Sequence, residues 1–173
     1  MSPLRGARLL AAWASMILAG TVVSAAVAAE PCSAPEYKQF DFWAGEWNVE
    51  ETGAPGKPVA VSRENKILGG CVLLENYEEP GGYSGKSMNF FDPFLRKWRQ
   101  TWVDAAGHVS EFSGELKDNA MRFEGESHVD GRRIFRRLVL TPLSADSVRQ
   151  RSEASSDGKT WKVNYDYTYV RKK

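Results

Sequence analysis

Short stretches of alternating apolar and polar residues follow one another through most of this sequence, and a turn separates nearly every pair. About ten such stretches recur at intervals of roughly ten residues. The connecting segments are rich in Gly, Pro, Asp and Asn, as in Thr52–Pro58, Pro80–Gly82 and Asp130-Gly131. No stretch after residue 29 sustains the apolar period of a helix. Connections this short cannot hold a crossover helix, so neighbouring strands must pair antiparallel.

The pattern predicts an all-β fold of about ten antiparallel strands in an up-and-down meander, which can close into a barrel or split into a sandwich. The barrel is favoured by the aromatic segment Phe40–Val49, because Phe40, Phe42 and Trp43 suit a short N-terminal helical plug over one end. The expected strands are Gly45–Glu51, Val59–Leu68, Cys71–Glu78, Tyr83–Asp92, Lys97–Asp104, Val109–Leu116, Ala120–Ser127, Arg132–Thr141, Ser147–Glu153 and Trp161–Arg171.

Residues 1–29 have the pattern of a cleaved signal peptide. Arg5 and Arg8 precede the apolar run Leu9–Val27, and Ala26-Val27-Ala28 offers small residues at the spacing of a signal-peptidase site. The alternative is an uncleaved membrane anchor, since the run is close to the length that crosses a bilayer. We expect export to the periplasm or the medium, with residues 30–173 forming a single domain.

Charge bears on the kinds of molecule that this protein can bind, and cysteine content bears on its compartment. The chain has 23 Lys and Arg against 22 Asp and Glu, and this near-balance argues against nucleic acid and against strong attraction to anionic lipid. The two cysteines, Cys32 and Cys71, suggest one disulfide in an oxidising compartment, while two free thiols remain the alternative.

The last strand alternates most clearly. Trp161, Val163, Tyr165, Tyr167 and Tyr169 share one face, which should point inward. Arg171 has the same parity. In a closed barrel the last strand lies beside the first, so the Arg171 guanidinium can stack on the Trp47 ring, unless the C-terminus is frayed and solvated.

Gly45-Glu46-Trp47 together with Arg171 resembles the G-x-W and arginine pairing of the calycin superfamily, which includes lipocalins, fatty-acid-binding proteins and nitrobindin-like barrels. The longer runs FDFWAGEW, GGCVLLENY, WRQTWVD and SSDGKTW resemble a bacterial family of exported calycin-like domains. The resemblance spans the whole chain after residue 29 and implies about ten antiparallel strands. It implies no particular activity, because members of that family have none established.

Two departures limit what the resemblance implies. Nitrobindin-like proteins hold haem through a histidine, but His108 and His128 both look like solvated residues at strand ends, so haem ligation is only a hypothesis. No Cys/His spacing matches a zinc site, and the sequence indicates no metal or cofactor. Lipocalins have eight strands, so their loop roles do not transfer.

Several inward positions are candidates for contact with a ligand. Trp98, Gln100 and Trp102 share one face, so Gln100 would lie between two indoles, able to contact a ligand or to bond a core neighbour. The facing of Tyr83–Asp92 stays open, because both of its faces are plausible inward sets. The candidate ligand-binding residues are Trp47, Glu75, Lys86, Met88, Trp98, Gln100, Trp102, Arg136, Arg149, Tyr165 and Tyr167.

Four arginines at positions 132, 133, 136 and 137 split between the two faces of one strand. Pairing with the glutamates at 111, 115, 124 and 126 on preceding strands predicts a solvated salt-bridge ladder. The alternative places Arg136 inward, where it would hold a carboxylate ligand.

These observations favour a periplasmic or secreted barrel that binds or carries a small, mostly apolar molecule. The first alternative is an isomerase or hydrolase that uses buried acids and tyrosines, and the second is an envelope interaction protein with a filled core. No catalytic residues are assigned, because neither histidine belongs to a nucleophile elbow and no glycine-rich loop precedes a helix. A packed interior would favour the structural alternative, and an inward acid with a raised pKa would favour the enzyme.

Overall fold

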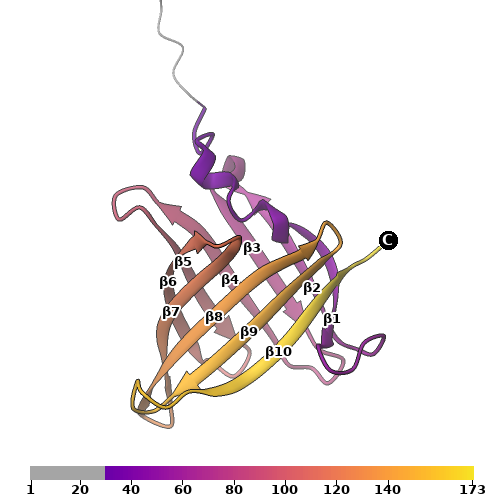
Figure 1. Ribbon diagram of the computed structural model, residues 1–173, viewed down its shortest axis with the longest axis vertical. Coiled ribbons are helices and arrows are strands. Elements are labelled where there is room, and N and C mark those ends of the chain that lie inside the picture. The colour runs from indigo at the N-terminus through magenta and orange to yellow at the C-terminus, as the bar shows by residue number, and fades with distance from the viewer. Residues whose placement is uncertain (1–29) are drawn as a thin grey trace, which may run out of the picture.

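A computed structural model describes residues 30–173 as a closed barrel of ten antiparallel strands (Figure 1). Each strand pairs with its sequence neighbours, and β1 pairs with β10 to close the cylinder. The all-β, up-and-down fold class is therefore confirmed. The predicted signal peptide, residues 1–29, lies outside the described residues.

The strand boundaries follow the turn chemistry closely. The strands are β1 Gly45–Glu51, β2 Pro58–Ile67, β3 Val72–Glu78, β4 Ser84–Asp92, β5 Lys97–Asp104, β6 Val109–Lys117, β7 Ala120–Val129, β8 Arg132–Ser144, β9 Ser147–Ser155 and β10 Lys162–Arg171. Three short 3₁₀ turns, η1 Pro35–Lys38, η2 Asp41–Trp43 and η3 Leu68–Gly70, lie at one end of the barrel (Figure 1).

The segment with η1 and η2 forms the predicted plug. Phe40 and Trp43 are fully buried, and their rings stack with centroids 5.2 Å apart. Trp43 meets the ring of Tyr169 on β10 edge to face at 5.7 Å. The indole N–H of Trp47 on β1 donates to the Trp43 carbonyl (2.9 Å). These contacts fill the barrel end near the N-terminus with aromatic side chains.

The seam between the first and last strands has the predicted arginine–tryptophan contact. Trp47 lies opposite Arg171 in the β1–β10 ladder, and the guanidinium carbon sits 4.1 Å from the centre of the Trp47 ring. Arg171 also donates to the carbonyl of Ala44 at 3.1 Å. Gly45 makes room for it, because a Cβ there would lie 2.2 Å from Arg171 Nη1.

The predicted disulfide between Cys32 and Cys71 is present, and it ties the plug segment to the start of β3. Such a bond points to an oxidising compartment outside the cytoplasm. Among residues 30–173, no helix is long and apolar enough to span a bilayer.

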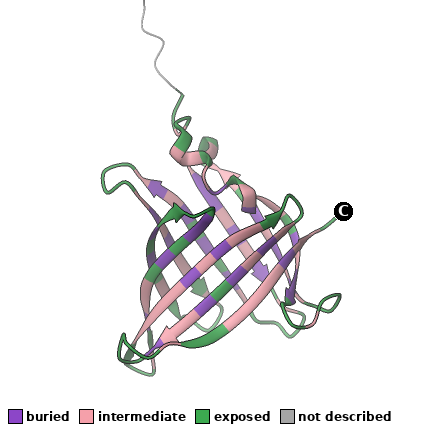
Figure 2. Ribbon diagram, viewed as in Figure 1, coloured by how far each residue is buried: buried purple, intermediate pink, exposed green. Residues whose placement is uncertain are grey.

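Inward and outward residues alternate along the strands (Figure 2). On β4 the inward set is Gly85, Ser87, Asn89 and Phe91, which settles the facing that the sequence left open. Lys86 and Met88 lie on the outer surface, so their placement among the pocket residues is wrong. Two features hold β4 in this orientation. The Trp102 ring covers Gly85, where a Cβ would lie 2.2 Å from the indole. Ser87 and Asn89 form hydrogen bonds to other buried groups.

A β-bulge corrects the prediction for the last strand. The β9–β10 register shifts between Val163 and Tyr165, leaving Asn164 as an extra residue. Tyr165, Tyr167 and Tyr169 face inward as predicted, but Val163 is 52% exposed. Trp161 also lies outside, where the Arg137 guanidinium stacks 3.9 Å from the centre of its ring.

The outer surface carries the salt bridges. Arg137 pairs with Glu124 (3.3 Å) and Arg133 with Glu126, which confirms part of the predicted ladder. Glu115 instead pairs with Lys97 on β5. Arg149, expected inside, points outward and holds Asp166 of β10 through two hydrogen bonds of 2.8 and 2.5 Å.

Candidate functional site

The barrel interior divides into a solid half beneath the plug and a hollow half. The hollow half is a cavity of about 380 Å³. Its rim is formed by the β3–β4, β5–β6 and β7–β8 turns, at the end opposite η1 and η2 (Figure 1). Ten strands leave more interior space than side chains alone need to fill, as barrel geometry predicts.

Six of the predicted ligand-binding residues line this cavity: Glu75, Gln100, Trp102, Arg136, Tyr165 and Tyr167. Trp47 and Trp98 face inward but belong to the solid half, where both are buried. Trp98 is held there by its indole N–H, which donates to the Gln39 side chain of the plug (3.1 Å).

Aromatic rings make much of the wall. The Tyr165 and Tyr167 rings stack with centroids 4.9 Å apart on β10, because two residues of strand spacing place them on one face. Across the barrel, Tyr77 on β3 meets Trp102 edge to face at 6.1 Å. Walls of this kind suit flat or apolar molecules.

A chain of buried polar side chains lies beside the cavity, and its two end members, Gln100 and Glu75, line it. Gln100 Nε2 donates to Asn89 Oδ1 (2.7 Å), Asn89 Nδ2 to Ser87 Oγ (2.8 Å), and Ser87 Oγ to Glu75 Oε2 (2.6 Å). Gln100 therefore both lines the cavity and bonds a core neighbour. The chain of bonds runs from β5 through β4 to β3 and fixes the orientation of the Glu75 carboxyl.

Glu75 belongs to a buried pair of acids. Glu64 on β2 is its cross-strand partner, and the two residues are only 2% and 3% exposed. Ser62 donates to Glu64 Oε1, and Glu64 Oε2 has no hydrogen-bond partner among the described residues. Burial raises the pKa of Glu75 from its ordinary 4.5 to about 7, although hydrogen bonds from Ser87 and Tyr169 oppose this. Burial and then the Glu75 charge raise the pKa of Glu64 well above 4.5.

Glu64 was not anticipated from the sequence. The inward face of β2 is small and polar, with Ala60, Ser62 and Glu64, whereas the apolar Val59 and Val61 lie on its other face. The hairpin itself contained the signal. Counting back equally from the Gly69-Gly70 turn places Glu64 opposite Glu75, as the register shows.

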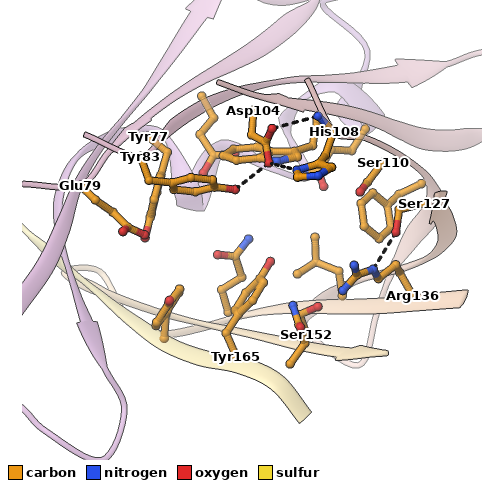
Figure 3. Close-up of a pocket in the computed structure, with 18 of the residues that line it drawn as sticks. Tyr77, Glu79, Tyr83, Asp104, His108, Ser110, Ser127, Arg136, Ser152 and Tyr165 are labelled. Atoms are coloured by element: carbon orange, nitrogen blue, oxygen red, sulfur yellow. Dashed lines mark hydrogen bonds and ion pairs between the residues drawn. The ribbon is translucent and has the colours of Figure 1, made fainter. Parts of the chain in front are cut away.

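Arg136 extends into the cavity from β8. Its Nε donates to Ser127 Oγ on β7 (3.0 Å), as Figure 3 shows. Within residues 30–173, no carboxylate lies within ion-pair distance of it, in contrast to Arg133 and Arg137 on the outer face. A guanidinium without an acidic partner is able to bind an anionic group.

A second polar cluster stands at the mouth and was missed by sequence reasoning. Asp104 Oδ2 accepts hydrogen bonds from Tyr83 (3.1 Å) and from His108 Nδ1 (2.9 Å), and its Oδ1 accepts the His108 backbone N–H. Partial burial acts to raise the pKa of Asp104, but the His108 and Tyr83 hydrogen bonds lower it below its ordinary value. Figure 3 shows this cluster across the cavity from Tyr165 and Ser152. The Asp/His spacing around the Ala105–Gly107 turn was the available signal.

Residues 30–173 form a closed ten-stranded antiparallel barrel with an open, aromatic-walled internal cavity. No protein-family model matches the chain, and no curated protein sequence matches it significantly.

Proposed function

We propose that this protein binds a small, mostly apolar molecule with an anionic end inside the barrel. The observation that carries the proposal is the cavity of about 380 Å³, a volume typical of small-molecule sites, walled by tyrosines and a tryptophan. A completely filled interior would favour a purely structural protein, but side chains fill this barrel only beneath the plug.

The Arg136 side chain supports an anionic end on the ligand. Ser127 holds the guanidinium in place through Nε, which leaves its remaining N–H groups for a carboxylate or a related anion. The Tyr165 hydroxyl belongs to the same wall, and the Arg136 charge is among the influences on its pKa. The apolar part of the molecule would then lie against Tyr165, Tyr167 and Trp102.

The expected place of action is the periplasm or the medium. The Cys32–Cys71 disulfide supports an oxidising compartment, and the leader-like pattern of residues 1–29 supports export. A carrier or sensor of small molecules in the envelope agrees with both features. It also agrees with the resemblance to calycin-like barrels.

The anionic subsite can be tested with two fluorescent probes that share the same rings. Anilinonaphthalene sulfonate carries an anion, and phenylnaphthylamine lacks it. Arg136→Met should weaken binding of the sulfonate by about tenfold or more, because a charge-assisted hydrogen bond is lost, and should leave phenylnaphthylamine binding unchanged. The matched control is Arg137→Met, since that arginine lies on the outer face of the same strand. Equal effects of the two substitutions would contradict the assignment of Arg136.

The cavity itself can be tested by filling it. Ser110 on β6 lines the cavity, while Ser113 on the same strand is exposed outside. Ser110→Trp should abolish binding of both probes, whereas Ser113→Trp should not change it. Native mass spectrometry of the exported protein should then reveal the natural ligand as a bound mass that Ser110→Trp loses. Probe binding that survives Ser110→Trp would place the site elsewhere and overturn the proposal.

A further inference from the structure

Glu75, which lines the cavity, and its buried cross-strand partner Glu64 have no role in simple binding, and burying two carboxyls is costly for a fold. We propose that the cavity is also a proton-transfer site, in which the Glu75 carboxylate acts as a general base on a bound molecule. The substrate class is a small, mostly apolar compound whose C–H bond is acidified by a neighbouring electron-withdrawing group. The inference rests on the proposed function in one respect, that such a compound enters the cavity.

Glu75 has the position of a catalytic base. It lines the cavity, yet its side chain is almost completely shielded from bulk water. Ser87 donates to Oε2 at 2.6 Å, and the Tyr169 hydroxyl lies 3.5 Å from Oε1. A carboxylate that is fixed in direction and poorly hydrated removes protons from carbon more readily than one in water.

The neighbouring Glu64 determines how protons are shared. Glu64 lies directly across the β2–β3 ladder, and Ser62 joins it to the same network. Two buried carboxyls so close cannot both ionise, so the pair retains one proton near neutral pH. Glu64 Oε2 has no hydrogen-bond partner among the described residues, and burial together with the Glu75 charge outweighs the opposing charge of Arg171, so Glu64 is the member that stays protonated. Glu75 is then left to take up and return a proton.

The Gln150 side chain supplies a hydrogen-bond donor near the Glu75 carboxylate. The Tyr169 hydroxyl donates to Gln150 Oε1 at 2.6 Å, which places the Gln150 amide next to Glu75. Gln150 lines the cavity, and its Nε2 has no hydrogen-bond partner in the part of the chain that the structure describes. It can donate to the negative charge that develops as the proton leaves.

The titratable groups that face Glu75 come from four strands. They are Glu64 on β2, Tyr77 on β3 itself, Tyr165 and Tyr169 on β10, and Arg136 on the β8 wall. Burial, and then nearby negative charges, raise the pKa values of all three tyrosines, which therefore stay neutral. Glu75 is the group of this set expected to ionise near neutral pH.

The test uses nitrobenzisoxazole, a small aromatic compound that reports proton abstraction from carbon. A base takes the ring C–H proton, the C–H electron pair forms a nitrile, and the N–O bond breaks to release a coloured cyanophenolate. The wild-type rate should rise with pH to a plateau, with a midpoint near 7. Glu75→Gln should lower kcat/KM by about 100-fold or more. The control Glu78→Gln removes an outward acid of the same strand and should have no effect.

Ser87→Ala provides a second variant that keeps the carboxyl. It removes a hydrogen bond that favours the ionised form of Glu75, so the midpoint of the pH–rate profile should move upward. A purely structural role for Ser87 would change the rate at every pH and leave the midpoint in place.

Competition with phenylnaphthylamine separates this proposal from the binding proposal. If nitrobenzisoxazole displaces the probe but is not turned over, or is turned over equally by Glu75→Gln, the proton-transfer proposal is overturned and binding stands. A cavity that takes phenylnaphthylamine but refuses the smaller compound also overturns it. If neither compound binds, both proposals fail.

Discussion

Single buried residues should make the stability of this barrel depend on pH. Glu75 has a pKa of 4.5 when exposed and about 7 in the folded protein. Between these values the folded chain holds more protons than the unfolded chain, so the free energy of unfolding falls as pH rises through this interval. Glu75 alone contributes a loss of about 3 kcal/mol, complete above pH 7. Glu75→Gln should therefore flatten the pH dependence, measured by urea unfolding across the interval.

Glu64 should act in the same direction, because its pKa is also raised by burial. Glu64→Gln therefore provides a second variant of the same pair, and Glu78→Gln on the outer face provides the control. Unchanged pH dependence in both inward variants would show that these carboxyls are more hydrated than their burial implies.

Gly45 and Arg171 should be energetically coupled. Gly45 adopts φ +140°, which disfavours any side chain, and a Cβ there would lie 2.2 Å from Arg171 Nη1. Gly45→Ala should lower the free energy of unfolding by about 1–3 kcal/mol through strain and displacement of the guanidinium. Arg171→Met should lose the stacking on Trp47, about 0.5–2 kcal/mol, besides its hydrogen bonds.

The double variant distinguishes coupling from two separate effects. In the Arg171→Met background, the methyl group that Gly45→Ala introduces meets no guanidinium. The double variant should therefore lose less unfolding free energy than the sum of the two single variants, by about 0.5 kcal/mol or more. Urea denaturation of the four proteins measures this difference. Strict additivity would mean that Gly45 is required for its backbone conformation alone.

Residues with a distinctive spacing could be predicted from the sequence, and residues defined by strand facing could not. Gly45, Trp47 and Arg171 form a recognisable motif across the seam, and the structure confirms their contact. Glu64 has no such motif. Its strand carries valines on the outer face, so the usual rule that apolar residues point inward selects the wrong side.

The plug is the element whose attachment can be tested most directly. The Cys32–Cys71 disulfide closes a loop with a sequence separation of 39 residues. Loop-closure entropy then predicts that Cys32→Ser combined with Cys71→Ser lowers the free energy of unfolding by about 4 kcal/mol. Urea denaturation checks the value, with reductant added to the wild type as a second route to the same state. Probe binding should persist, because the cavity lies at the opposite end. A simultaneous loss of binding would mean that plug and cavity are coupled.

Element boundaries and element faces differ in how well the sequence defines them. Turn chemistry ends the strands, so nearly all boundaries were predicted within a few residues. Faces depend on a contrast between apolar and polar sides. β4 lacks that contrast, because its inward Ser87 and Asn89 are polar and belong to the buried hydrogen-bond chain between Gln100 and Glu75. β10 has the contrast, but the bulge at Asn164 reverses the faces before it, and a bulge has no strong sequence signal.

At the scale of the whole molecule, the barrel has two ends with different tasks. The plug end buries Phe40, Trp43 and Trp47, together with Met121 and Leu140, in an aromatic and aliphatic core. The mouth end holds the cavity and a polar rim that includes Asp104 and His108. The free energy of local opening should therefore be higher near the plug than near the mouth, because ligand-binding regions are usually among the less stable parts of a fold.

Hydrogen exchange can measure this division along each strand. In the free protein, amides of β7 near Met121 should exchange slowly, because that end of the strand is packed beneath the plug, and amides of the same strand near Ser127 and Val129 should exchange faster. Saturating anilinonaphthalene sulfonate binds only the folded form, so it should slow exchange at the mouth end more than global stabilisation alone would. In Arg136→Met at the same probe concentration this local effect should shrink. Uniform protection along β7, with and without the probe, would mean that the barrel opens only as one unit and that the mouth is no more mobile than the plug.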